Sequence, residues 1–176
     1  MQNISATLNT EPFPHIIYHD FYDDDELKLI WEELNFYTKP DKLFDVKDYL
    51  GIEGYTKSKA IHLDSVYKGK NRKISNILEV SRKIFNIKIL KPFTQIHDCC
   101  SLATASNYDI TKVRYYHNED HYKPHLDSYF DFLAFSYFYK EPKKFDGGNL
   151  IFPKYNYEYA CDNNSVIMMP SWVEHG

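Results

Sequence analysis

The sequence predicts an α+β protein with a β-sandwich or jelly-roll core. Two observations lead to this class: helical patterns stand in the first half of the chain, and short strand candidates follow one another after Pro92. The strand candidates are 93–98, 111–117, 132–139, 149–153 and 165–169. Turn-forming residues separate them, at Asn107, at Pro142, at 147–148 and at 163–164.

The segments before Pro92 are read from polarity and spacing. Residues 1–12 are polar and are expected to be a loose N-terminus, and 13–21 reads as a first strand. Residues 23–37 should be helical, because apolar side chains recur at helical spacing there. Residues 38–70 lack a clear period and are expected to be loop with short strand pieces. The pattern turns helical again over 71–86.

Composition describes one soluble domain, expected over residues 13–176. Tyrosine (16) and phenylalanine (12) are abundant, which favours strands and an aromatic-lined pocket. The net charge of −4 and the scattered lysines argue against a nucleic-acid partner. No apolar run reaches membrane-spanning length, so no membrane partner is expected. Composition leaves the oligomeric state open.

The three cysteines are expected to be reduced. Cys99 and Cys100 are adjacent, and Cys161 makes the count odd. We therefore expect a cytoplasmic protein. A structural zinc site is not expected, because no second spaced cysteine pair is present.

Three pairs place a histidine two residues before an acid, where chance predicts about one. The pairs are His62/Asp64, His117/Glu119 and His125/Asp127. The first precedes a basic stretch and the second lies in a turn-like segment, so both read as surface residues. His125 stands among aromatic residues before the strongest strand candidate, where residues i and i+2 point to the same side. His125 and Asp127 could thus bind one ion.

His175 is the natural third ligand. It follows an apolar strand and a Pro-Ser-Trp bend, 48 positions after Asp127, which is far enough for the chain to fold back. Two imidazoles and one carboxylate bind a divalent first-row metal and leave coordination positions open. That arrangement suits a chelating co-substrate together with O2.

Three segments then resemble the prolyl 4-hydroxylase type of 2-oxoglutarate/Fe(II) dioxygenase. "VRYYHNEDHYKPHLD" (113–127) resembles its iron-binding segment. "FDGGNLIFP" (145–153) resembles a family strand, in which the two glycines are expected to form a tight bend, and "NNSVIMMPSWVEH" (163–175) resembles the segment that leads to the distal histidine. The opening segment 11–34 is similar to the family's first strand and helix.

The resemblance implies a double-stranded β-helix with N-terminal helices packed on one side. It implies Fe(II) on His125, Asp127 and His175, with 2-oxoglutarate and O2 as co-substrates, succinate and CO2 as co-products, and ascorbate as a possible helper. The substrate would be a peptidyl-proline or a related peptide, amino acid or small molecule. By resemblance, Tyr137 would hydrogen-bond the far carboxylate of 2-oxoglutarate, and Tyr116 is a second pocket candidate.

The sequence departs from the family at its end. The family places an Arg or Lys about ten positions after the distal histidine to pair with 2-oxoglutarate, whereas the chain ends at Gly176. The domain is therefore expected to be truncated after the distal histidine, without its last strand. Substitute cations are Lys140, Arg114 and Lys123.

Three alternatives remain open. The chain could be a non-catalytic protein of the same fold that lacks the anchoring cation. It could be a cupin-type isomerase or binding module, although such sites usually carry three histidines and a glutamate. A nucleic-acid demethylase of the same superfamily is disfavoured by the negative charge.

Overall fold

The computed structural model describes residues 4–39, 41–49, 52–127 and 129–176. It confirms the α+β class, with several antiparallel sheets. The chain divides into two compact units. The first combines Met1–Asp23, Ile84–Asn107 and Pro124–Gly176, and the second combines Asp24–Lys83 and Tyr108–Lys123. No sheet closes into a barrel within the described ranges.

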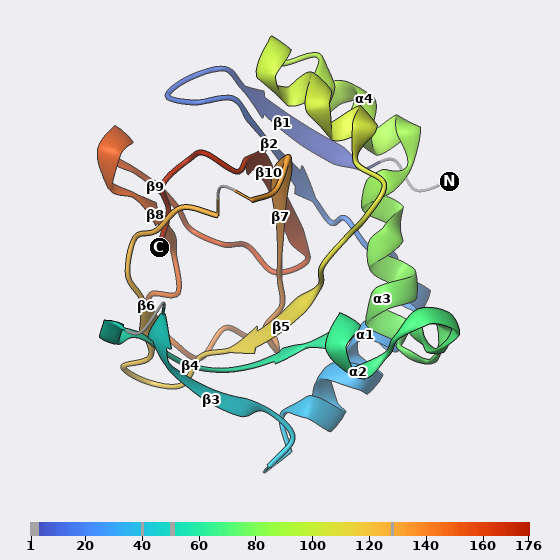
Figure 1. The fold of residues 1–176 in the computed structure, drawn as a ribbon, viewed down its shortest axis with the longest axis vertical. Helices are drawn as coiled ribbons and strands as arrows, with labels where there is room; N and C mark the ends of the chain where they lie inside the picture. Colours follow the sequence, from blue (N-terminus) through green and yellow to red (C-terminus); the bar gives the residue numbers. More distant parts are fainter. Residues whose placement is uncertain (1–3, 40, 50–51, 128) are drawn as a thin grey trace. The chain divides into compact units, whose positions relative to one another are not determined.

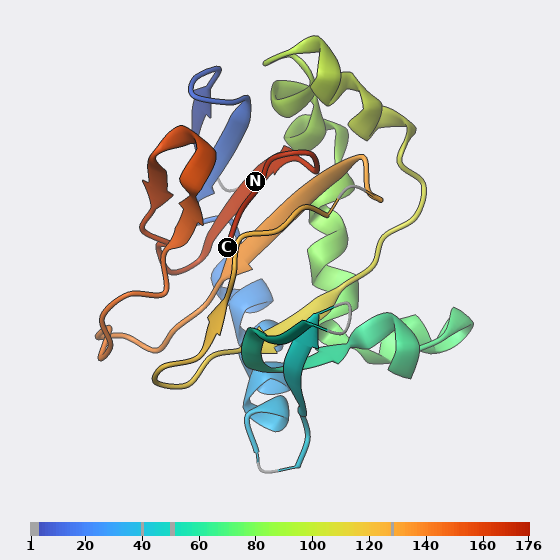
Figure 2. The same ribbon diagram turned by 60° about the vertical axis from the view of Figure 1, so that its left-hand side comes forward.

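The first unit is built on a four-stranded antiparallel sheet in the order β1-β2-β10-β7 (Figure 1). Its strands are β1 (Ser5–Asn9), β2 (His15–His19), β10 (Ser165–Pro170) and β7 (Phe132–Tyr137). Strands β7 and β10 run side by side as the orange and red arrows of Figure 2. All six residues of β10 are buried, which fits its apolar sequence and central position.

A second layer of the same unit starts from the hairpin of β8 (Leu150–Phe152) and β9 (Tyr157–Tyr159). Backbone hydrogen bonds join Ile151 to Gly176, and others join His175 to His125, so the hydrogen-bonded ladder continues past β8. A hydrophobic core draws residues from both layers: Phe13, Ile17, Leu150, Phe152, Tyr159, Cys161, Ile167, Met169 and Val173.

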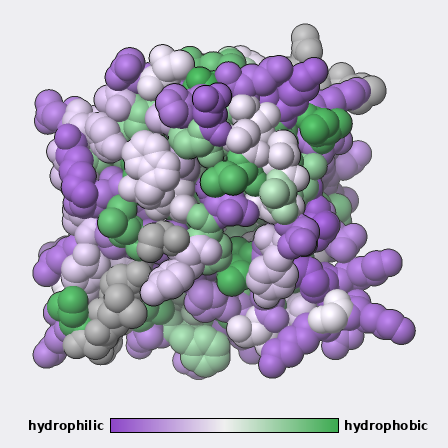
Figure 3. Space-filling model, turned by 45° about the horizontal axis from the view of Figure 1, so that its top comes forward, coloured by the Kyte–Doolittle hydropathy of each residue, from purple (hydrophilic) through white to green (hydrophobic). Residues whose placement is uncertain are grey.

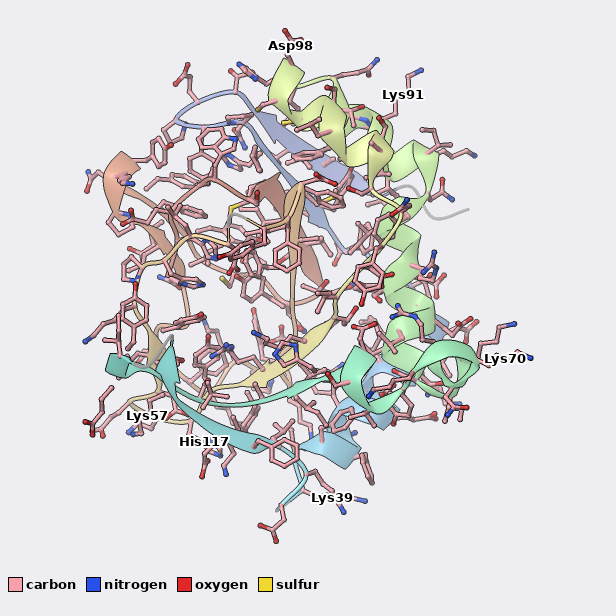
Figure 4. The ribbon with its side chains drawn as sticks, in the orientation of Figure 1. Lys39, Lys57, Lys70, Lys91, Asp98 and His117 are labelled. Atoms are coloured by element: carbon pink, nitrogen blue, oxygen red, sulfur yellow. The ribbon has the colours of Figure 1, made fainter. Side chains whose placement is uncertain are left out.

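Short helices complete the first unit: η2 (Arg82–Phe85, whose first residues belong to the second unit), α4 (Ile87–Thr94) and η3 (Asp98–Ala105). A fourth short helix, η4 (Pro153–Tyr155), lies between β8 and β9. Lys91 on α4 and Asp98 on η3 are exposed and labelled in Figure 4. The three cysteines are free, as expected.

The second unit combines a sheet with helices that share one core. The strands are β3 (Phe44–Tyr49), β4 (Ile52–His62), β5 (Lys112–Tyr115) and β6 (His121–Tyr122), and β4 pairs with each of the others. The helices are α1 (Asp24–Tyr37), α2 (Leu63–Val66), η1 (Gly69–Ile74) and α3 (Asn76–Ser81). Their core contains Tyr37, Leu43, Ile61, Leu63 and Leu78.

Three sequence expectations need correction. Residues 93–98 are not a strand: Phe93 ends the buried face of α4, which Ile89 and Leu90 begin, and η3 follows. Residues 5–9, expected within a loose terminus, form β1. The segment 38–70 contains an eleven-residue strand, β4, rather than short pieces.

Among the described residues, no helix is both long and apolar enough to cross a membrane. On the face drawn in Figure 3, hydrophobic residues form separate spots among hydrophilic ones.

Candidate metal centre

A backbone bridge holds two histidines beside each other in the first unit. The amide of His125 donates to the carbonyl of His175 at 2.8 Å, and the amide of His175 donates back at 3.0 Å. The chain brings His175 to this place through a tight bend, in which the amide of Val173 donates to the carbonyl of Pro170 at 3.3 Å. The two imidazole centroids lie 4.5 Å apart.

Asp127 completes the group. Its Oδ2 lies 3.8 Å from Nε2 of His125 and 3.8 Å from Nε2 of His175. One ligand atom from each of the three residues lies within 4.8 Å of the others. These distances are too long for direct hydrogen bonds. Two atoms bound at about 2.1 Å to one ion lie at most about 4.2 Å apart, so a small adjustment would let all three bind the same ion.

The donor set fits a metal ion because one of its atoms is buried and unsatisfied. The protonated Nδ1 of His175 donates to the carbonyl of Val173 at 2.9 Å, so Nε2 carries the lone pair. This Nε2 is buried and accepts no hydrogen bond within the described part of the chain. Leaving a buried acceptor unpaired costs about 1–3 kcal/mol, and a metal ion would satisfy it.

Burial also sets the charge of the group. His125 is 7% exposed and His175 2%. Burial lowers the pKa of His175, against the smaller raising effects of the Val173 carbonyl and of Asp127. A neutral imidazole is the form that binds metals.

The site is closed on the histidine side and open on the carboxylate side. The ring of Phe135 packs 5.2 Å from that of His175, whereas the Asp127 side chain keeps 29% of its exposure. The hydroxyl of Ser171 donates to the carbonyl of Phe130, which ties the bend before His175 to the segment after Asp127. Further ligands could therefore reach an ion beside Asp127.

The predicted triad thus converges, although the reasoning from strand geometry holds only in part. His125 forms a single bridge, and no regular strand runs through 125–127. Asp127 nevertheless points to the same side as His125, as the spacing predicted. The group could hold a metal ion, and its geometry does not identify which metal.

Tyr137 lies on β7, two residues after Phe135. Leu133, Phe135 and Tyr137 all pack against the hydrophobic core of the first unit. The Tyr137 ring lies 6.1 Å from that of Tyr159. Its role toward 2-oxoglutarate stays a prediction.

Tyr116 belongs to the second unit and is 47% exposed, with the Arg114 guanidinium 5.9 Å from its ring. Arg114 and Lys123 belong to the same unit, and Lys140 of the first unit is exposed. None of these positions tests the roles proposed for them.

Among the described residues, the two other histidine–acid pairs belong to no cluster that could hold a metal ion. Asp64 is an ion-pair partner of Arg72, and His62 is exposed at the end of β4. His117 contacts Asp120 instead of Glu119, and the same carboxylate pairs with Lys57 at 3.6 Å. Lys57 and His117 are labelled close to each other in Figure 4.

Gly147 and Gly148 have φ values of 77° and 75°, which supports the predicted tight bend before β8. Sequence reasoning missed the carbonyl of Val173. The signal was available, since a carbonyl two residues before a ligand histidine often fixes its ring.

Comparison of this chain with models of protein families, with curated proteins and with solved structures gave no match.

Proposed function

We propose that this protein is an Fe(II)- and 2-oxoglutarate-dependent oxygenase that hydroxylates a peptidyl-proline or a related peptide or amino-acid substrate. One observation carries the proposal: His125, Asp127 and His175 converge, and the buried Nε2 of His175 has no hydrogen-bond partner among the described residues. Two histidines and one carboxylate on one side of an ion are the ligand set of non-haem Fe(II) oxygenases.

The fold of the first unit supports this proposal. The ladder β9-β8-Gly176 continues through His175 to His125 and shares a core with the sheet that contains β10 and β7. Two antiparallel layers around one core, with the metal ligands on the smaller layer, are compatible with a jelly-roll.

Each residue would have a distinct task. His125, Asp127 and His175 would hold the ion, and the carbonyl of Val173 would keep the His175 ring oriented. Bound iron would supply the redox chemistry, in which O2 and 2-oxoglutarate yield succinate, CO2 and one oxygen atom inserted into a substrate C–H bond. Tyr137 would donate a hydrogen bond to the far carboxylate of 2-oxoglutarate.

Succinate formation tests the proposal. The metal-stripped protein is incubated with Fe(II), 2-oxoglutarate and ascorbate, with and without O2, and succinate is quantified. We expect O2-dependent succinate that disappears in His125→Ala and persists in His117→Ala, because His117 is a largely exposed histidine outside the triad. Metal binding without succinate, with or without proline-containing peptides, would instead support a non-catalytic metal-binding protein.

A further inference from the structure

The second unit contains an arginine that has no acidic partner among the described residues. The three arginines of the chain are Arg72, Arg82 and Arg114. Arg72 and Arg82 both pair with Asp109. For Arg114, no carboxylate within the described residues lies at ion-pair distance, although its side chain is only partly exposed on the middle of β5. A partly buried cation without a counter-ion favours an anion at that place.

The guanidinium of Arg114 is held in position by neutral groups. Its Nη1 donates to Thr56 Oγ1 at 3.0 Å and to Ser58 Oγ at 2.6 Å. Its central carbon lies 4.4 Å from the ring centre of Tyr122. Both hydroxyl residues are buried on β4. These contacts use one nitrogen and fix the plane of the group, so the remaining N–H donors are available in a fork that matches a carboxylate.

A hollow of about 290 Å³ lies beside this arginine. It is lined by Phe44, Val46, Ala60, Ile61, His62, Ser65, Val66, Lys112 and Arg114. Among the described residues, the lining contains three basic side chains, several apolar ones and no acidic one. The strand register explains this grouping, since Ala60 pairs with Arg114, and His62 pairs with Lys112.

The electrostatics of the hollow agree with its composition. The pKa of His62 is lowered, first by burial and then by Lys112 and Arg114. A third positive charge, on His62, is therefore disfavoured beside Lys112 and Arg114, and a negative ligand is favoured. The apolar lining adds a preference for a ligand with a hydrocarbon or aromatic body, and the volume lies at the small end of ligand pockets.

We propose that this hollow on the β3-β4-β5 sheet binds a small organic carboxylate, with Arg114 gripping the carboxylate group and Phe44, Val46 and Val66 contacting the apolar body. The proposal rests on the second unit alone and does not depend on the oxygenase assignment. Inorganic phosphate fits less well, because it has no apolar part to fill the hollow.

Fluorine NMR with 4-fluorobenzoate tests the proposal on the metal-free protein. Without a metal, the His125–Asp127–His175 group offers the probe no ion to bind. 4-Fluorobenzyl alcohol is the uncharged control of similar shape, and phosphate is the control without an apolar body. We expect the fluorine signal of 4-fluorobenzoate to broaden and shift on titration with the protein. Its affinity should be at least about tenfold above that of the alcohol. Salt should weaken carboxylate binding.

Substitutions then locate the site. Arg114→Gln should weaken 4-fluorobenzoate binding by about tenfold or more, and Arg114→Lys should recover only part of it, because lysine lacks the bidentate fork. Arg82→Gln is the matched control and should bind as the wild type does. If Arg114→Gln fails to fold, two tests of the proposal remain. One is the binding of 4-fluorobenzoate by Lys112→Gln, and the other is the comparison of acid with alcohol in the wild type. Equal binding of acid and alcohol, or no binding of either, would overturn the proposal.

Discussion

Removal of the Asp127 carboxylate is the sharpest test of the metal centre. Asp127 lies 3.8 Å from both histidine Nε2 atoms and makes no closer side-chain contact with either. Asp127→Ala should therefore leave the metal-free fold nearly unchanged, within about 0.5 kcal/mol of wild-type stability. Metal binding should instead fall by more than the roughly 10–100-fold loss that follows removal of a supporting group around a metal site.

The expected size of the effect follows from linkage between binding and folding. A metal present at 100 times its dissociation constant stabilises the folded state by about 2.7 kcal/mol. For a chain of this length, about 1 kcal/mol corresponds to roughly 2–4 °C in melting temperature, so saturation should raise it by about 5–11 °C. A hundredfold weaker site at the same metal concentration retains only about 0.4 kcal/mol, or about 1–2 °C.

Thermal unfolding with and without Mn(II), which replaces Fe(II) without being oxidised in air, measures this difference. His117→Ala is the matched control, because it removes a largely exposed histidine from another histidine–acid pair. The wild type and His117→Ala should show the full shift, and Asp127→Ala almost none. An equal shift in all three proteins would mean that the metal binds elsewhere, and the assignment of the triad would be wrong.

Three further outcomes are expected. His15 is fully buried between the Phe13 carbonyl and Asn9, and burial lowers its pKa. The unfolded state then binds more protons than the folded state just below pH 6.5, so stability should fall with falling pH by up to about 1.4 kcal/mol per pH unit for this group. Chemical denaturation of His15→Gln should show a flatter dependence of stability on pH, and a slope identical to that of the wild type would contradict this. The buried carboxylate of Glu33 accepts hydrogen bonds from Ser75 and from the amide of Ile77. Glu33→Ala should therefore lower the free energy of unfolding by about 1.5–3 kcal/mol in denaturant titration, and Glu33→Gln should lower it less. An alanine variant as stable as the wild type would refute this prediction. Tyr137→Phe should raise the KM for 2-oxoglutarate about tenfold while Mn(II) affinity stays unchanged, and an unchanged KM would remove Tyr137 from the co-substrate site.

The sequence predicted that His125, Asp127 and His175 converge. This prediction needed the local spacing of the first two residues and one long-range assignment, that of His175. The His125–Asp127 spacing needs only an extended backbone to bring both side chains to one side. The position of His175 depends on strands that fold back, and it was identified through the bend that follows an apolar strand. The backbone bridge between the two histidines could not be predicted, since it depends on pairing between residues fifty positions apart.

The missed strands share a physical reason. Strand β1 is almost wholly exposed and is held by its backbone pairing with β2, so it has no apolar alternation to detect. Strand β4 alternates correctly, but Thr56 and Ser58 occupy buried positions where apolar residues are the usual signal. Their hydroxyls bind Arg114, so the feature that hid the strand in the sequence is the feature that positions the guanidinium.

The strand over 93–98 was predicted wrongly because Pro92 was taken as the boundary between the helical and the strand-rich parts of the chain. Proline usually interrupts a helix because it lacks an amide donor. In α4 it stands near the C-terminal end of a helix whose buried face is formed by Ile89, Leu90 and Phe93. This spacing is helical, and the burial of that face outweighs the loss of one hydrogen bond in a short helix.

The two candidate sites obey the same rule of unsatisfied polar groups. In the first unit, the Nε2 of His175 is a buried acceptor to which no described residue donates a hydrogen bond. In the second, Arg114 is a partly buried donor whose described partners are neutral hydroxyls and aromatic rings. Folded proteins rarely leave such groups unpaired without a compensating ligand. The site at His175 should therefore bind a cation, and the site at Arg114 should bind an anion. The binding of each ion can be tested while the other site is empty or mutated.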